Sequence, residues 1–306
     1  MDLSHASIIL FDVGFYLRTP RGTIHWRDLG GEGRSIVLVH GLGGSIANWD
    51  AVGPRLVKAG KVAAIDLPGF GLSPPWADWE LDTHASAVRA FLETQGPATL
   101  VGNSMGGLIS EMVASSSPHL VESLVLICPA TPPRLRDPLL HWPTARRLTL
   151  QSTRAIGPAY ARRYLSANPP ERLVRNAIRW TTHSPARVPP TMVQAFLEMA
   201  RIRKHFPWAS QAVPMTSQSM RRLYWRPSRF VAMIRDIVSP TLVIQGEADH
   251  IVSPNAVRWM ASLRPDWNLV VMEDTGHTPH LDAPVRLGGI IESWMSRELG
   301  REAISA

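Results

Sequence analysis

Residues 100–107, which read LVGNSMGG, decide the fold. A short apolar run ends here in a Gly-x-Ser-x-Gly pattern, and a segment with helical character follows. A strand that turns abruptly into a helix needs glycines near the apex, because a Cβ there would make the two arms of the turn clash. The pattern therefore predicts a nucleophile elbow with Ser104 at its apex and the N–H of Met105 facing the same space. A glycine-rich connection without chemistry fits the pentapeptide as well, so the rest of the chain has to decide.

The segments around this turn alternate between strand-like and helix-like patterns. Such an order predicts a mostly parallel sheet covered by helices on both faces, that is, an α/β fold. A hairpin is expected first, over residues 8–26. Strands are then expected at residues 35–39, 62–65, 98–101, 124–127, 241–244 and 269–272. Helices are expected near residues 48–56, 81–95, 108–115, 256–263 and 283–299.

A different kind of segment interrupts this order. After Pro129 no strand-like run occurs until about residue 236, and short helical patches alternate with prolines. We interpret residues 131–235 as an inserted helical cap, with residues 1–130 and 236–306 forming the core. Residues 131–236 hold 19 Lys and Arg against 4 Asp and Glu, whereas the remainder holds 13 against 21. The cap is therefore strongly basic, although the whole chain carries only +7.

Composition limits the class of protein. With 306 residues, 45% hydrophobic and 19% charged, the chain is globular, and no apolar run approaches the roughly 20 residues of a membrane span. The first residues carry an acid and no basic region before the first apolar run, so we expect no signal peptide and a cytoplasmic enzyme. Cys128 is the only cysteine, which excludes an internal disulfide and a cysteine-based metal site.

Acidic and histidine residues follow two later strands, where a parallel sheet places catalytic groups. Asp249 lies beyond the strand at 241–244, and His277 lies beyond the strand at 269–272. A serine hydroxyl needs a nearby base, and the imidazole needs a carboxylate on its other nitrogen. The order Ser104, Asp249, His277 therefore predicts a catalytic triad. Glu247 and Asp274 are the rival acids.

With these motifs the chain resembles the α/β-hydrolase family over nearly its whole length. The matching pieces are residues 40–43 (HGLG), 66–73 (DLPGFGLS), 102–107 (GNSMGG), 246–249 (GEAD) and 276–277 (GH). The resemblance implies Ser104 as nucleophile, Asp249 as acid and His277 as base. It also implies an oxyanion hole made by the N–H groups of Leu42 and Met105. His40, Asp66 and Ser73 are expected to brace loops.

Within this fold the elbow is similar to those of the monoacylglycerol-lipase-like and bacterial lipase and carboxylesterase branch. A serine at the elbow implies acyl transfer to water, so we expect a serine esterase acting on a lipid-like ester with a hydrophobic acyl chain. The alternative is a carbon–carbon bond hydrolase of meta-cleavage products, which usually has a Ser-Gly-Pro type oxyanion loop and an aromatic residue after the catalytic histidine. Here Leu42-Gly43-Gly44 and Thr278 stand at those positions. A non-catalytic receptor or scaffold fits less well, since all three triad residues are present.

No cofactor and no metal are expected. The histidines are not in ligand spacing, and the glycine-rich loops match an oxyanion hole better than a phosphate cradle. The basic cap raises two possibilities for a partner. Arg172, Arg175 and Arg179 form one stripe of an amphipathic segment, a pattern typical of peripheral contact with an anionic membrane. Alternatively, the arginines are solvated or pair with the acidic core. Nucleic-acid binding is not expected, because no recognised binding module accompanies the charge.

Overall fold

The computed structural model describes residues 14–133, 153 and 156–305. An eight-stranded sheet runs through the molecule in the order β1-β2-β4-β3-β5-β6-β7-β8. The first two pairings, β1 with β2 and β2 with β4, are antiparallel, and all later ones are parallel. This confirms the predicted mostly parallel sheet. The strands are β1 (Phe15–Thr19), β2 (Gly22–Gly30), β3 (Ser35–Val39), β4 (Lys61–Ile65), β5 (Ala98–Asn103), β6 (Val121–Ile127), β7 (Thr241–Gly246) and β8 (Asn268–Met272).

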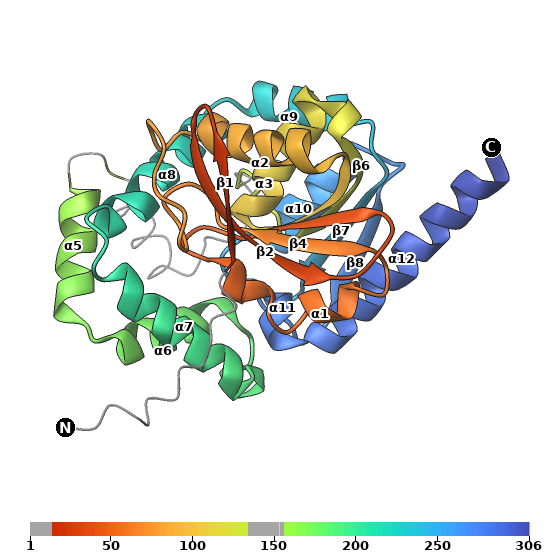
Figure 1. Ribbon diagram of the computed structural model, residues 1–306. Helices are drawn as coiled ribbons and strands as arrows, with labels where there is room; N and C mark the ends of the chain where they lie inside the picture. The colour runs from red at the N-terminus through yellow and green to blue at the C-terminus, as the bar shows by residue number, and fades with distance from the viewer. Residues whose placement is uncertain (1–13, 134–152, 154–155, 306) are drawn as a thin grey trace.

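Helices cover both faces of this sheet (Figure 1). The helices of the core are α1 (Gly53–Leu56), α2 (Leu81–Gln95), α3 (Met105–Ser116), α10 (Pro254–Ser262), α11 (Pro279–Asp282) and α12 (Pro284–Ser305), with short 3-10 turns η1 (Ile46–Trp49) and η2 (Pro118–Leu120). Strands β3 to β7 are buried on both sides of the sheet for most of their length. In β8 only Met272 is buried. The continuous apolar runs in the sequence reflect this burial.

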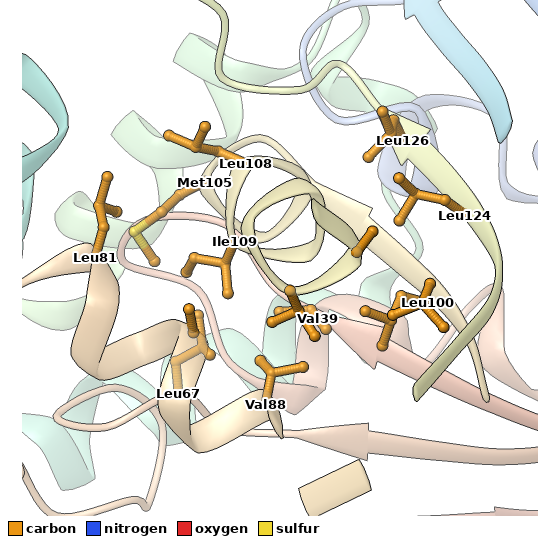
Figure 2. Close-up of a cluster of buried hydrophobic side chains, with 14 of the residues drawn as sticks. Val39, Leu67, Leu81, Val88, Leu100, Met105, Leu108, Ile109, Leu124 and Leu126 are labelled. Carbon is orange, nitrogen blue, oxygen red and sulfur yellow. The ribbon is translucent and has the colours of Figure 1, made fainter. Parts of the chain in front are cut away.

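Two apolar clusters occupy the two faces of the sheet. One lies beneath α2 and α3 and includes Val39, Leu100, Met105 and Leu108 (Figure 2). The other lies beneath α1 and α12 and includes Trp49 and Trp294, both almost fully buried. Because α3 is held by the first cluster along its buried face, the turn that precedes it at Ser104 is fixed against the sheet.

The hairpin and one helix differ from the prediction. Residues 8–13 of the expected hairpin lie outside the described residues, and the hairpin that is described runs from Phe15 to Gly30. The single helix expected at residues 48–56 is wrong, because the chain forms η1 and then α1 with a turn between them. Pro54 lies in the first turn of α1, where a backbone N–H would have no partner within the helix. The proline therefore favours the start of a new helix over continuation of η1.

The described part of the segment between β6 and β7 contains helices and connecting loops but no strand. It forms α5 (Gly157–Ala167), α6 (Pro170–Thr181), α7 (Pro190–Arg203), α8 (Ala209–Tyr224) and α9 (Pro227–Asp236), with a 3-10 turn η3 (Pro185–Arg187). Helices α5 to α8 lie together at one side of the sheet (Figure 1), whereas α9 packs against α3. Residues 134–152 of the expected cap lie outside the described residues. Among the residues that are described, no helix is both long and apolar enough to cross a membrane.

Candidate active site

Ser104 lies in a tight turn between β5 and α3, with φ 53° and ψ −118°. Both neighbouring glycines are required by close backbone approach. A Cβ on Gly102 would lie 2.5 Å from the carbonyl oxygen of Gly106, and one on Gly106 would lie 2.2 Å from that of Val39. The Ser104 N–H donates to the carbonyl of Ile127 at 2.9 Å, which ties the turn to the next strand. The sharp turn predicted at this pattern is therefore present, with an uncommon positive φ at its apex.

The structure brings Ser104, His277 and Asp249 into one hydrogen-bonded row. Nε2 of His277 lies 2.9 Å from Oγ of Ser104, and Nδ1 of the same ring lies 2.8 Å from Oδ2 of Asp249. An ionised carboxylate only accepts hydrogen bonds, so Nδ1 carries the proton and Nε2 is free to accept the serine hydroxyl. All three side chains are buried, with Ser104 retaining 9% exposure.

Several donors keep the Asp249 carboxylate ionised. Its Oδ1 accepts the N–H groups of Ile251 at 2.8 Å and Val252 at 3.0 Å, and its Oδ2 also accepts Nε2 of Gln245 at 3.1 Å. Burial acts to raise the pKa of Asp249, but the imidazole of His277 and the two backbone N–H groups outweigh it and hold the pKa below its usual value. The Asp249 carboxylate is thus charged at neutral pH and fixed in direction.

The rival residues lie elsewhere. Glu247 and Asp274 are exposed, and His277 makes its carboxylate contact with Asp249 alone among the described residues. His250 is exposed. His280 is fully buried against the ring of Trp49, and burial lowers its pKa to about 3, so it is neutral and packed in the core.

The loop after β3 passes beside the serine turn. A Cβ on Gly41 would lie 3.2 Å from Cβ of Ser104, so the loop passes in tight contact with the serine turn. The N–H of Gly44 donates to the carbonyl of Gly41 at 3.0 Å, and Gly43 has φ +78°, which closes a turn around Leu42. Met105 is the first residue of α3, so its N–H has no partner within the helix. The N–H groups of Leu42, in this turn, and Met105 are the two expected to form an oxyanion hole.

Buried polar side chains brace this loop. Nδ1 of His40 lies 2.8 Å from the carbonyl of Gly41, and its Nε2 accepts the N–H of Leu67 at 3.0 Å. Burial lowers the pKa of His40, which keeps the ring neutral and makes this arrangement stable. Asp66 accepts the N–H of Ile46 at 2.8 Å, and the Oγ of Ser73 donates to the carbonyl of Asp66 at 2.7 Å. The sequence expectation of loop-bracing residues agrees with these contacts.

A cavity of about 1200 Å³ opens above Ser104, between the core and helices α5 to α8. Its wall includes Leu42, Ser104 and His277 from the core. The apolar side chains that α5 to α8 contribute to the wall include Leu165, Leu173, Ile178, Phe196, Met199, Val213 and Met220. Such a cavity suits a hydrophobic ligand whose reacting group lies at the serine.

Sequence reasoning missed three polar residues of this region. Asn103 donates from Nδ2 to the carbonyls of Ile127 at 3.0 Å and His277 at 3.2 Å, which ties the serine turn to the histidine loop. Gln245 contacts Asp249 as described above. Arg203, in the last turn of α7, donates to the carbonyl of Gly43 at 2.8 Å and lines the cavity. Asn103 lies within the 102–107 motif and Gln245 only four residues before Asp249, but the contacts of Asn103 and Arg203 join segments distant in sequence, which no short motif reveals.

Cys128 lies beside the same residues. Its Sγ, a carboxylate oxygen of Asp249 and a ring nitrogen of His277 all lie within 4.8 Å of one another. The Cys128 thiol accepts the N–H of Gly246 at 3.3 Å, and burial raises its pKa well above the usual value. A neutral thiol is a poor metal ligand, and both ring nitrogens of His277 already have partners. The donor set therefore fits the hydrogen-bonded row better than a metal ion.

Comparison with known proteins identifies the family. Residues 34–284 match the alpha/beta hydrolase fold family, so the chain is a member of that family. This agrees with the resemblance drawn from the sequence motifs. The matched range includes Ser104, Asp249 and His277 and both flanks of the helical segment between β6 and β7.

Similar proteins include enzymes of more than one substrate class. The pimeloyl-[acyl-carrier protein] methyl ester esterase of Methylococcus capsulatus is 39% identical over 120 residues, which is 39% of this chain and 45% of that protein. Lipase 3 of Moraxella sp. is 24% identical over 82% of this chain and 74% of its own length. The structure of 2-hydroxy-6-oxo-6-phenylhexa-2,4-dienoate hydrolase from Rhodococcus sp. strain RHA1 superposes with a TM-score of 0.72 at 22% identity, covering 93% of this chain and 99% of that one. Lipases and esterases are thus among the relatives, which supports hydrolase activity without resolving the substrate.

Proposed function

We propose that this protein is a serine hydrolase that cleaves carboxylic esters with a hydrophobic acyl part. Oγ of Ser104 attacks the ester carbonyl carbon while Nε2 of His277 takes the hydroxyl proton. The imidazolium then gives this proton to the departing alcohol, and an acyl-serine remains. A water molecule, deprotonated by His277, attacks the acyl-serine, and the acid leaves as Ser104 regains its proton.

One observation carries this proposal: the unbroken row from Ser104 through His277 to the ionised Asp249 at the floor of an apolar cavity. In each step negative charge develops on the carbonyl oxygen. The N–H groups of Leu42 and Met105 are proposed as its donors, and their position at a glycine turn and a helix N-terminus supports that role. The steps need no metal or organic cofactor.

The test is a panel of nitrophenyl esters of increasing acyl length, with a meta-cleavage product alongside. We expect saturable hydrolysis of the esters, with KM falling as the acyl chain lengthens along the apolar wall. A dienoate turned over with a far larger kcat/KM than any ester would reject the ester assignment while keeping the triad.

A carbon–carbon bond hydrolase is the second candidate, and Arg203 is the observation that favours it. Arg203 lines the cavity, and its guanidinium donates to the carbonyl of Gly43 and lies 5.9 Å from the centre of the Phe70 ring, with no ion pair to a carboxylate among the described residues. A dienoate substrate carries a carboxylate that such a cation would bind. Replacing Arg203 by Met separates the two candidates: KM should rise for a dienoate and change little for a neutral ester.

We further propose that residues 131–235 act as a cap over the cavity and that its basic face contacts an anionic membrane peripherally, in a cytoplasmic enzyme. Arg172, Arg175 and Arg179 are exposed on α6, and none of them forms an ion pair with a described residue. Trp225 lies at the wall of the cavity with 75% of its surface exposed. Exposed arginines and an exposed tryptophan on one helical segment are typical of an interfacial surface.

Vesicle binding tests this contact. We expect binding to vesicles of anionic lipid but not of zwitterionic lipid, and binding should weaken steeply as salt rises. Reversing Arg172, Arg175 and Arg179 to glutamate should lower vesicle binding and turnover of long-chain esters while short soluble esters are hydrolysed as before. Reversing Arg55, Arg258 and Arg286, which are exposed outside the cap, is the matched control. An equal loss of vesicle binding in both variants would show an effect of net charge alone and would contradict a specific contact through α6.

A further inference from the structure

Asp282 joins the loop that carries His277 to the end of cap helix α6. This carboxylate lies at the last residue of α11, five residues after His277, and is only 4% exposed. Its Oδ2 accepts the N–H of Gly276 at 2.8 Å and that of His183 at 2.9 Å, and its Oδ1 accepts the N–H of Ser184 at 3.0 Å. One buried side chain therefore holds the residue before the histidine and the second and third residues after the end of α6.

A second set of contacts reinforces this junction. The backbone N–H and the Oγ1 of Thr278 both donate to the carbonyl of Thr181, the last residue of α6, at 3.1 Å. Gly276 lies so close to the chain after α6 that a Cβ on it would come within 2.7 Å of the backbone nitrogen of His183. Leu281 belongs to the same apolar cluster as Val174 and Ile178 of α6. The histidine loop and the cap helix are thus packed together along their backbones.

The backbone of His277 is consequently held on both sides. Before it, the N–H of Gly276 is bound by Asp282, and after it, the N–H of Thr278 is bound by Thr181. Its own carbonyl accepts Nδ2 of Asn103 from the serine turn. The side-chain row needs an Nε2 to Oγ contact of 2.9 Å, and a displacement of about 1 Å at such a contact can lower a rate 100-fold.

We propose that Asp282 is a positioning residue, which sets the place of the base His277 and couples it to the position of cap helix α6. The inference rests on the proposed role of His277. The inference also links His277 to the proposed membrane contact, because α6 carries the exposed Arg172, Arg175 and Arg179. A shift of α6, for example on contact of its basic face with a surface, would move His183 and Ser184. Through the Asp282 carboxylate it would then displace Gly276, next to His277.

Asp282→Asn tests the inference with little change of shape. One amide oxygen can still accept, but the NH₂ group then faces a backbone N–H, so at least one of the three hydrogen bonds is lost. We expect kcat for a short soluble ester to fall about 10- to 100-fold with KM changed by about twofold or less. The downfield proton resonance of the hydrogen bond between His277 and Asp249 should weaken, and the amides of Gly276, His183 and Ser184 should exchange faster. Asp274→Asn, the same change at an exposed position of the same loop, is the control and should behave as wild type.

The outcomes separate this inference from the proposed function. His277→Ala is assayed in parallel. If it abolishes hydrolysis while Asp282→Asn keeps the wild-type kcat and the wild-type downfield resonance, the positioning role is wrong and the proposed function stands. If His277→Ala remains active, the proposed function itself fails. Should Asp282→Asn not fold, Asp282→Glu keeps the charge and moves the oxygens by one methylene; kcat should then fall less than 10-fold but measurably, and an unchanged kcat overturns the inference.

Discussion

Replacing Asp249 by Asn should reverse the proton arrangement of His277. The N–H groups of Ile251 and Val252 both donate to Oδ1 of Asp249, so the amide oxygen of an asparagine is held at that position. Its NH₂ group then occupies the place of Oδ2, 2.8 Å from Nδ1 of the imidazole. An NH₂ group donates and cannot accept, which favours the ring with its proton on Nε2. That proton faces Oγ of Ser104, so the base is blocked.

The expected size of this effect follows from the same geometry. An imidazole held in the wrong tautomer beside a serine lowers kcat by about 10⁴-fold, which corresponds to about 5.4 kcal/mol of transition-state stabilisation. The fold should survive, because the replacement is isosteric and two of the backbone hydrogen bonds remain. The assay is steady-state hydrolysis of a short nitrophenyl ester, with circular dichroism to check the fold. A loss below about tenfold in Asp249→Asn, together with a large loss in Asp274→Asn, would refute the assignment of the acid.

Two buried titratable groups give predictions of pH-dependent stability. The pKa of His280 is lowered to about 3 in the folded state, so between pH 6.5 and 3 the unfolded chain binds the extra proton and stability falls as pH falls. His280→Phe should reduce this slope by up to about 1.4 kcal/mol per pH unit in urea titrations, and an unchanged slope would contradict the burial of a neutral ring. Glu111 is buried with both carboxylate oxygens unpartnered among the described residues, and burial raises its pKa well above 4.5, so stability is lost as pH rises above that value. Glu111→Met should therefore stabilise the protein more at pH 8 than at pH 4.5, and equal effects at both values would contradict this.

Features that depend on local sequence could be predicted. The strand before Ser104 is largely apolar because it is buried on both sides. Glycine is needed two residues before and after the serine, because a Cβ at either position would come within 3 Å of neighbouring backbone. The order of the strands then brings loops distant in sequence to one edge of the sheet. For that reason Asp249 and His277 could be chosen from the sequence, and the structure brings them to Ser104.

Features that depend on tertiary contacts could not be predicted. Asp282 has no sequence signal of its own, because its three donors come from two segments about 95 residues apart in the chain. Arg203 is one of many arginines in the basic segment between β6 and β7, and only the folded chain distinguishes it by placing it against Gly43. The break between η1 and α1 does have a local signal, since Pro54 is typical of the first turn of a new helix.

The proposed reaction requires that Ser104 becomes acylated, and intact-mass spectrometry with a fluorophosphonate probe measures this. We expect one adduct per chain, located by peptide mapping on the peptide that contains Ser104. Ser104→Ala should give no adduct and no ester hydrolysis above background. An adduct on another residue, or undiminished esterase activity in Ser104→Ala, would contradict it.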